Sequence, residues 1–201
     1  MRVLDVGCGD GYLGKLLARR GYLVTGVERD GGTSPAFPHA SVRLIVADLE
    51  QGLPPLPHAC DYVLCADILE HLRQPGRLLA QIREHALAPG GTLVASLPNS
   101  GNIWFRLNIL LGRFPQDDKG LFDRTHIRFY MWDGWQLLFA KAGFHFVSVQ
   151  SSAIPVALVA PPQWSRSLLI RAAESVSYGM ARLWKTLFAY QFVVSAKSLP
   201  E

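Results

Sequence analysis

Two kinds of hydrophobic pattern alternate along the chain. Short runs of apolar and β-branched residues predict seven strands, at residues 2–6, 23–28, 42–49, 60–67, 92–98, 144–149 and 190–196. Apolar residues repeated every three or four positions predict helices between them, at residues 12–20, 75–88, 133–143 and 165–187. Because strands and helices alternate, we expect an α/β fold around a doubly wound, mostly parallel sheet.

Local signals mark several of the predicted helix ends. Pro75 stands where its helix begins, and Pro89-Gly90-Gly91 is expected to end that helix before the next strand. Asp133 is expected to cap the helix that stops at Gly143. Gly, Pro and Ser crowd residues 29–41, so we expect a short helix there or none.

Two segments do not fit the alternation and are expected to be insertions in a single domain of residues 1–201. Residues 99–130 begin with an apolar, weakly cationic helix at 102–114 and continue with a stretch dense in ionisable side chains. Residues 153–187 begin with an apolar, proline-broken stretch and continue with an amphipathic helix that starts at Ser165. The apolar surface of both has two interpretations: it packs on the core, or it faces a membrane or a lipid-linked acceptor.

The turn after the first strand has the composition of a ligand cradle. Glycines permit a sharp turn and a close approach to a ligand, and the following helix start offers free N–H groups. The pattern Gly9-x-Gly11-x-x-Gly14 also matches a dinucleotide site, with Glu28 at the distance of a ribose contact. However, Asp5 and Asp10 would repel a pyrophosphate, so they favour a ligand with an ammonium and a sulfonium. A glycine turn without any ligand is the third interpretation.

Further polar side chains follow the other predicted strands. Glu28, Asp48 and the segment Cys65 to Asp67 stand at the carboxyl ends of the second, third and fourth strands. Ligands of doubly wound sheets bind outside this edge. We therefore expect these residues to converge with the glycine turn on one site.

Composition excludes several classes of function. The chain of 201 residues is 49% hydrophobic and carries a formal charge of +4, with no dense Lys/Arg block of the kind that binds nucleic acid. Its three cysteines, Cys8, Cys60 and Cys65, lack metal-ligand spacing, so we predict reduced thiols, a cytoplasmic location and no metal site. The apolar stretches are too short to span a bilayer, and no signal peptide is visible.

Taken together, the motifs resemble class I methyltransferases that depend on S-adenosylmethionine (SAM). The stretch Val3-Leu4-Asp5-Val6-Gly7-Cys8-Gly9-Asp10-Gly11 is similar to their first motif, and the segment Ile68-Leu69-Glu70-His71-Leu72 and the Pro-Gly-Gly turn recur at fitting distances. The resemblance covers residues 2 to about 150 and implies a Rossmann-like sheet of seven strands with an antiparallel last strand. The two insertions would then rise over the active site as a substrate cap.

The resemblance also implies a cofactor site. Glycines would wrap the methionine part of SAM, Asp5 would hold its ammonium with help from Asp10, Glu28 would bind the ribose, and Asp48 the adenine beside Leu49. The predicted cofactor-binding residues are Asp5, Gly7, Cys8, Gly9, Asp10, Gly11, Glu28, Asp48, Leu49 and Cys65. A helical segment usually precedes the first motif in this family. Here Met1 adjoins the first strand, so we expect either a chain start further upstream or an open cofactor site.

Transfer of a methyl group to a hydroxyl requires a base, and two histidines are candidates. His126 lies beside Asp123, which could orient its ring, and beside Arg124 and Arg128, which could hold a phosphate or carboxylate of the acceptor. The alternative is that these charged residues form a structural ion-pair cluster. His71 and Asp67 follow the fourth strand, close to the expected position of the methyl group.

The insertion further resembles a bacterial subgroup associated with cell-surface polysaccharide and lipid-linked sugar synthesis. The segments that carry this likeness are Gly112-Arg113-Phe114 and Leu121-x-Asp123-Arg124-Thr125-His126-x-Arg128-Phe129. It implies O-methylation of a sugar, glycolipid or other small hydroxyl acceptor, with peripheral membrane contact. The alternative is a non-catalytic protein with the methyltransferase fold that acts as a partner through its cap.

Overall fold

A computed structural model describes residues 1–30, 41–154 and 167–199. Two predictions concern residues that lie largely outside this range. They are the short or absent helix after the second strand and the proline-broken stretch that begins the second insertion.

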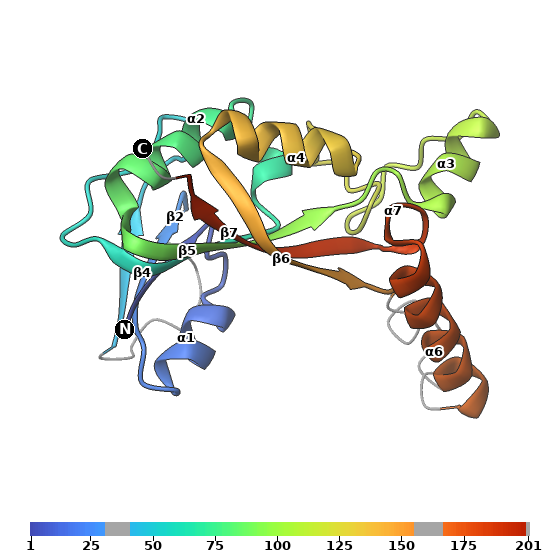
Figure 1. The fold of residues 1–201 in the computed structure, drawn as a ribbon, viewed down its shortest axis with the longest axis horizontal. Coiled ribbons are helices and arrows are strands. Elements are labelled where there is room, and N and C mark those ends of the chain that lie inside the picture. Colours follow the sequence, from blue (N-terminus) through green and yellow to red (C-terminus); the bar gives the residue numbers. More distant parts are fainter. Residues whose placement is uncertain (31–40, 155–166, 200–201) are drawn as a thin grey trace.

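The described residues form one seven-stranded sheet (Figure 1). Its strands are β1 (Arg2–Val6), β2 (Leu23–Glu28), β3 (Val42–Val46), β4 (Cys60–Ala66), β5 (Leu87–Pro98), β6 (Phe144–Ser152) and β7 (Gln191–Ser198). The order is β3-β2-β1-β4-β5-β7-β6, in which β1 to β5 are parallel and β7 is antiparallel to both β5 and β6. This arrangement confirms the predicted Rossmann-like fold and its antiparallel last strand.

Helices cover both faces of the sheet. The helical elements are α1 (Tyr12–Ala18), η1 (Leu69–His71), α2 (Pro75–Gln81), η2 (Ile82–Ala86), α3 (Ile103–Leu110), α4 (Trp132–Lys141), α6 (Leu168–Leu183) and α7 (Lys185–Phe188). Figure 1 shows α1 on one face, α2 and α4 on the other, and α3, α6 and α7 gathered at one end of the molecule.

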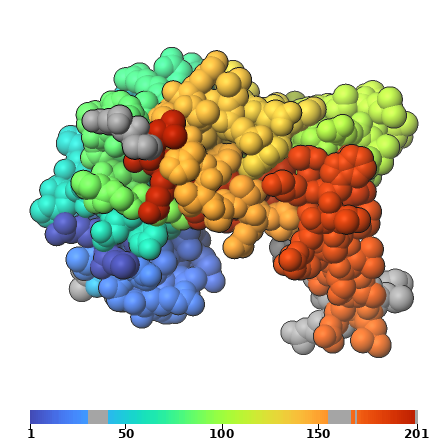
Figure 2. All heavy atoms as spheres, viewed as in Figure 1, coloured from blue at the N-terminus to red at the C-terminus, as the bar shows by residue number. Residues whose placement is uncertain are grey.

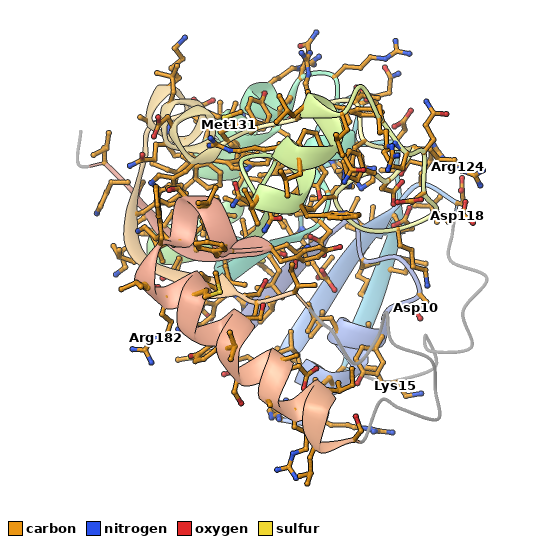
Figure 3. All side chains as sticks on the ribbon, turned by 90° about the vertical axis from the view of Figure 1, so that its right-hand side faces the viewer. Asp10, Lys15, Asp118, Arg124, Met131 and Arg182 are labelled. Carbon is orange, nitrogen blue, oxygen red and sulfur yellow. The ribbon has the colours of Figure 1, made fainter. Side chains whose placement is uncertain are left out.

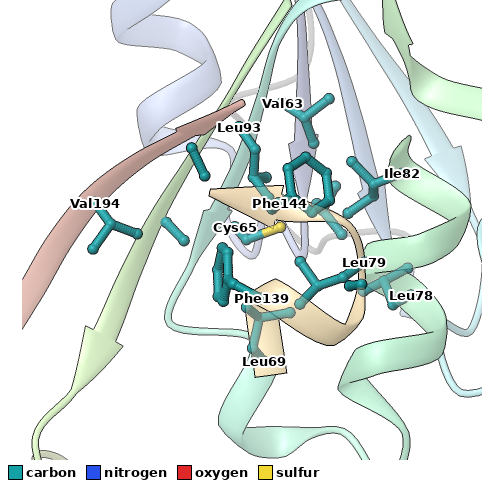
Figure 4. Packing of buried hydrophobic residues seen from close by; sticks show 14 of the residues in the cluster. Val63, Cys65, Leu69, Leu78, Leu79, Ile82, Leu93, Phe139, Phe144 and Val194 are labelled. Atoms are coloured by element: carbon teal, nitrogen blue, oxygen red, sulfur yellow. The ribbon is translucent and has the colours of Figure 1, made fainter. Parts of the chain in front are cut away.

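The main core lies between the sheet and α2 and α4 (Figure 4). Alternate side chains of the central strands point to this face and meet the apolar stripes of the helices, such as Leu78 and Leu79 of α2 and Trp135 and Phe139 of α4. The indole N–H of Trp135 donates to the backbone oxygen of Pro98, 2.9 Å away, which satisfies the one polar atom of that side chain. The core thereby holds the carboxyl ends of β4 and β5 in place.

Two predicted boundaries are wrong. The helix that begins at Pro75 ends as a π turn at Ala86, and β5 starts at Leu87, because that residue already pairs with Cys60 of β4. The Pro-Gly-Gly sequence therefore lies inside β5. Asp133 is not a cap: α4 starts at Trp132 after Met131, and Asp133 lies in the first turn. An acidic residue also stabilises that position, through the helix dipole.

The two insertions meet through buried amides. The side-chain amides of Asn99 and Asn102 both donate to the backbone oxygen of Ala189 at 2.9 Å, and Asn102 also caps α3 by accepting from the N–H of Trp104. These bonds tie the start of α3 to the chain that enters β7. The position of α3 at this end of the molecule follows from them.

The outer turns of α3 and α6 leave large apolar side chains exposed. Leu110 of α3 is 81% exposed, and Leu168 and Leu183 of α6 are 80% and 89% exposed. Figure 2 shows α6 reaching away from the body of the sheet. At these positions the predicted apolar stripe does not pack on the core. Within the described residues, none of the helices combines the length and the apolar character needed to cross a bilayer.

Candidate active site

The glycine turn after β1 needs its glycines. Gly7, Gly9 and Gly11 have φ of 72°, 53° and 72°, in the left-handed region that other residues rarely adopt. The N–H groups of Gly7 and Cys8 both donate to the backbone oxygen of Val27, which holds the turn against β2. A β-carbon at position 7 would lie only 2.7 Å from the side chain of Ile68, which is too close. Glycine at this position therefore lets the turn pack tightly against the segment after β4.

Asp5 is buried at the end of β1 beneath this turn. It is 2% exposed, and its Oδ2 has no hydrogen-bond partner among the described residues. Burial, and secondarily the charge of Glu28, raise the pKa of Asp5 to about 6. A desolvated carboxylate with a free oxygen is suited to a cation, so this position fits the ammonium of the predicted cofactor.

Glu28 braces the turn from the end of β2. Its carboxylate accepts from the N–H of Gly9 at 2.9 Å and from the N–H of Arg29 at 2.8 Å. These bonds fix the carboxylate in place and leave further lone pairs for the ribose hydroxyls of a nucleoside. Glu28 also lines a cavity of about 340 Å³ together with Gly7, Asp48 and Leu49. Four of the predicted cofactor residues therefore share one cavity.

The remaining predicted cofactor residues are not among those that line this cavity. Asp10 is exposed, and its Oδ1 accepts from the N–H of Tyr12 at the start of α1, 3.0 Å away. The thiol of Cys8 is buried in the turn, and burial, followed by the charge of Asp5, raises its pKa to about 12. Cys65 is fully buried in the main core, with a pKa raised by the same desolvation. Cys65 therefore supports the site by packing and does not line the cavity.

A second, smaller cavity of about 170 Å³ lies next to the first. Its lining includes Asp67, Glu70, His71, Lys119, Asp123, His126, Tyr190 and Gln191. His71 lines both cavities, because it follows β4 directly at the carboxyl edge of the sheet. The two cavities thus meet at one imidazole, and the second is the candidate acceptor site.

Asp67 is held in a strained backbone conformation, with φ of 51°. Its Oδ1 accepts from the hydroxyl of Ser96 at 2.9 Å and from the amide of Gln191 at 2.7 Å. Strands β5 and β7 therefore position this carboxylate in the acceptor cavity.

The insertion brings a second histidine to the first. The ring centroids of His71 and His126 lie 4.7 Å apart, and Nδ1 of His71 lies 3.1 Å from both the backbone oxygen and the hydroxyl of Thr125. Burial, and then the nearby His71, lower the pKa of His126. His126 is therefore uncharged at neutral pH.

Asp123 does not orient the imidazole of His126 as predicted. Its Oδ1 accepts instead from the hydroxyl and the N–H of Thr125, at 2.6 and 2.8 Å. Desolvation alone would raise the pKa of Asp123, but these two bonds outweigh it and lower the pKa. Asp123 thus acts on the histidines through Thr125, which contacts His71.

Glu70 is a site residue that the sequence analysis missed. It is 1% exposed, neither carboxylate oxygen has a hydrogen-bond partner among the described residues, and Oε1 lies 3.8 Å from Nε2 of His126. Burial is the main cause that raises its pKa to about 8. The available signal was an acid flanked by Ile68, Leu69 and Leu72, because apolar surroundings seldom bury an unpaired carboxyl without a function.

The two arginines that were predicted to hold the acceptor have other partners in this structure. The guanidinium of Arg124 pairs with exposed Asp118 at 3.0 Å, as Figure 3 shows at the edge of the molecule. The guanidinium of Arg128 donates to the backbone oxygen of Arg73 at 2.6 Å. Neither arginine is among the residues that line the described acceptor cavity. The backbone N–H groups of residues 127–128 donate to the carbonyl of Glu70, which holds this part of the insertion against η1.

The family follows from a comparison with known proteins. Residues 1–149, most of the chain, match the family model described as a methyltransferase domain. The chain belongs to the methyltransferase domain family. This finding confirms the predicted SAM-dependent methyltransferase domain and SAM as its cofactor.

The relatives found by sequence match only part of the chain. Over 105 residues it is 32% identical to a ubiquinone biosynthesis O-methyltransferase of Caulobacter sp. (strain K31), a match that covers 49% of the chain and 41% of the relative. Over 106 residues it is 37% identical to a protein of the same name from Aeromonas salmonicida (strain A449), covering 49% of the chain and 43% of the relative. The chain thus spans less than half the length of these relatives.

Solved structures resemble nearly the whole methyltransferase domain. A SAM-dependent methyltransferase from Archaeoglobus fulgidus superposes with a TM-score of 0.65 at 20% identity, covering 98% of this chain and 86% of that one. A Burkholderia thailandensis 1,6-didemethyltoxoflavin-N1-methyltransferase with bound S-adenosylhomocysteine gives 0.60 at 18% identity, covering 99% and 71%. At these identities the likeness establishes the fold.

Proposed function

We propose that this methyltransferase domain transfers a methyl group from SAM to a hydroxyl group of a small acceptor. The observation that carries the proposal is the junction of the two cavities at His71. A residue at such a junction is close to both the methyl donor and the attacking oxygen. The O-methyltransferase names of the relatives support the choice of oxygen as the acceptor atom.

The cofactor residues have distinct roles in this proposal. The cofactor, when bound, supplies a methyl group already activated on a sulfonium. Asp5 holds the ammonium, Glu28 accepts from the ribose hydroxyls, and Asp48 accepts from the adenine amino group while Leu49 packs against the ring. The three glycines of the turn at residues 7–11 permit the close approach of backbone to cofactor that these contacts need.

The proton of the acceptor hydroxyl leaves through the polar cluster of the smaller cavity. His71 and His126 are the two candidate bases, since an imidazole near neutral pH can accept a proton. Asp67, fixed by Ser96 and Gln191, orients the acceptor by accepting one of its hydroxyl protons in a hydrogen bond. The chain's own contribution to the reaction is therefore positioning and proton removal.

The chemistry of the smaller cavity favours a neutral acceptor rich in hydroxyl groups. Its lining combines three carboxyl side chains, Asp67, Glu70 and Asp123, with one lysine, whereas both nearby arginines point elsewhere. An anionic group would be repelled there, but a sugar can donate hydrogen bonds to carboxylates. We therefore propose that the methyl acceptor is a sugar, a glycolipid or a similar hydroxyl compound, either free or linked to a lipid.

Calorimetry with SAM and S-adenosylhomocysteine tests the cofactor part of this proposal. Labelled-methyl transfer to a panel of sugars and phenolic hydroxyl compounds tests the acceptor part. Binding of SAM with transfer to a hydroxyl is the expected result. Binding without transfer to any acceptor would favour a non-catalytic partner protein, and the absence of binding, in this chain and in a version extended upstream, would refute the enzyme proposal.

We also propose that the end of the molecule formed by α3 and α6 contacts the cytoplasmic surface of a membrane. Exposed leucines there stand beside cations such as Arg182, which points outward from α6 in Figure 3. Apolar side chains enter the interface while cations meet anionic head groups. Three buried free thiols, Cys8, Cys60 and Cys65, support a reducing compartment.

Sedimentation with anionic vesicles measures this membrane contact. The chain is expected to co-sediment at low salt, and Leu183→Glu should reduce the bound fraction several-fold because a carboxylate resists burial in lipid. Leu137→Glu is the matched control, since Leu137 is also more than half exposed but lies on α4. Equal binding by both variants, or no binding by the unmodified chain, would contradict the contact.

A further inference from the structure

Three potential metal ligands meet at the wall of the acceptor cavity. Single ligand atoms of Glu70, His71 and His126 all lie within 4.8 Å of one another. They come from two parts of the chain, since Glu70 and His71 belong to η1 after β4 and His126 belongs to the first insertion. Their spacing in the sequence contains no metal-binding pattern, which is why the sequence analysis predicted no metal site.

Glu70 has little to compensate its burial, since the ring nitrogen that pairs with it, Nε2 of His126, lies 3.8 Å from Oε1. Both of its carboxylate oxygens are buried without a hydrogen bond among the described residues. Two acidic neighbours, Asp67 and Asp123, raise the pKa of Glu70 further, because their negative charges disfavour its ionised form. A buried carboxyl group in this situation is strongly stabilised by a cation.

The ring of His71 is held by a backbone carbonyl group in the way that histidine metal ligands are. Nδ1 of His71 lies 3.1 Å from the backbone oxygen of Thr125, so a proton on Nδ1 donates there and leaves the lone pair of Nε2 free. Such outer bonds fix the tautomer and orientation of histidine ligands. For His126, Nε2 is the nitrogen that lies 3.8 Å from Oε1 of Glu70.

We propose that Glu70, His71 and His126 bind a divalent transition-metal ion of the zinc class. Two imidazoles and one carboxylate are a ligand set that suits zinc, cobalt and iron, and they leave at least one coordination position open. With metal–ligand bonds of roughly 2.0–2.2 Å, the ligand atoms would draw together to about 3.3 Å from one another. Rotation of the three side chains about their χ angles would provide this contraction.

The open position would face the acceptor cavity, which Asp67 and Asp123 also line. This role rests on the proposed function. The metal-bound acceptor hydroxyl would lose its proton to water, and the resulting oxygen anion would form a bond to the methyl carbon as the carbon–sulfur bond breaks, with that electron pair remaining on sulfur. The two histidines would then serve as metal ligands in place of bases.

Titration of the untagged, chelator-treated chain with Co²⁺ tests the site by its visible absorption, and calorimetry with Zn²⁺ gives stoichiometry and affinity. We expect one equivalent to bind, with the absorption of a site of low coordination number. Glu70→Gln and His126→Ala should each weaken binding by more than about 100-fold, since even outer partners of metal ligands contribute up to that factor. Circular dichroism and SAM calorimetry establish that each variant is folded.

The chain provides a matched control for this experiment. Glu84 and His85 form the same Glu-His sequence on η2, are exposed, and lie away from the acceptor cavity. Glu84→Gln and His85→Ala should leave Co²⁺ binding unchanged. Absence of Co²⁺ binding, or equal binding by the Glu70→Gln and Glu84→Gln variants, would overturn the inference; if Glu70→Gln does not fold, His126→Ala alone decides it.

Activity separates this inference from the proposed function. Methyl transfer that stops in metal-free protein and returns with added Zn²⁺ or Co²⁺ supports both. Methyl transfer that continues in metal-free protein would overturn the catalytic role of the metal and leave the methyltransferase proposal intact. If the unmodified chain does not bind SAM in calorimetry, this would instead count against the proposed function, whatever the result of the Co²⁺ titration.

Discussion

Replacing Asp5 by asparagine is expected to weaken SAM binding by about 100-fold, since a charge-assisted hydrogen bond to a buried carboxylate contributes roughly 1.5–3 kcal/mol. The side chain of Asp5 is buried and has an oxygen without a partner among the described residues, so its interaction with an ammonium is poorly screened. Calorimetry on the two proteins at pH 8 measures the difference.

The same substitution is expected to stabilise the protein without cofactor. The pKa of Asp5 is raised from 3.8 to about 6, so its carboxylate is disfavoured by folding. This group therefore supports folding below pH 4 and loses that support as the pH rises through 6, at a cost of up to about 3 kcal/mol at pH 8. Thermal unfolding at pH 8 should show a higher midpoint for Asp5→Asn than for the unmodified chain.

The pH dependence of SAM binding provides an independent test of Asp5. A cation binds the ionised carboxylate, so the affinity of the unmodified chain should fall as the pH decreases through about 6. Asp5→Asn should lack this dependence. Asp30→Asn is the control, because Asp30 is an exposed acid two residues after β2 that pairs only with Arg29 among the described residues. A fall of SAM affinity in Asp30→Asn as large as in Asp5→Asn would assign the effect to net charge and refute the role of Asp5.

Replacing His71 by alanine is expected to lower kcat by about 10²- to 10⁴-fold, the range measured for loss of a group that assists proton removal. His71 lines both cavities, so it is the side chain placed to act where the donor and the acceptor meet. His126→Ala should also lower kcat. SAM affinity should change little in His126→Ala, because His126 lines only the acceptor cavity.

Steady-state kinetics with labelled SAM compares these variants with His85→Ala. His85 is exposed on η2 and contacts neither cavity, so its replacement should leave kcat unchanged. Unchanged rates in both His71→Ala and His126→Ala would refute the roles proposed for the two histidines in the reaction, whereas their role as metal ligands is decided by the Co²⁺ titration.

Some of the site follows from short stretches of sequence. The turn at residues 7–11 requires glycine because its backbone has positive φ at three positions, and this requirement is local. Asp5, Glu28 and Asp48 stand at strand ends, and the carboxyl ends of parallel strands share one edge of the sheet in any fold of this kind. The gathering of these residues at one edge of the sheet could therefore be predicted before the structure.

The acceptor site depends on contacts between distant segments. His126 approaches His71 and Glu70 from more than fifty positions further along the chain, because residues 127–128 pair with the backbone of Glu70. Arg124 and Arg128 bond to Asp118 and to the backbone of Arg73 and do not line the acceptor cavity, which the sequence alone did not indicate. Burial decides the chemistry of Glu70, and burial is a property of the packed molecule.

The amino-acid sequence by itself determined the class of this protein: the order of strands and helices, the glycine turn, and the acids at the strand ends. These features are encoded locally, by hydrophobic period, backbone conformation and position along each strand. Only the tertiary structure decided which polar groups lose their water, which lie together, and which point to solvent. Desolvation and long-range packing set those outcomes, and both arise when the insertion folds against the sheet.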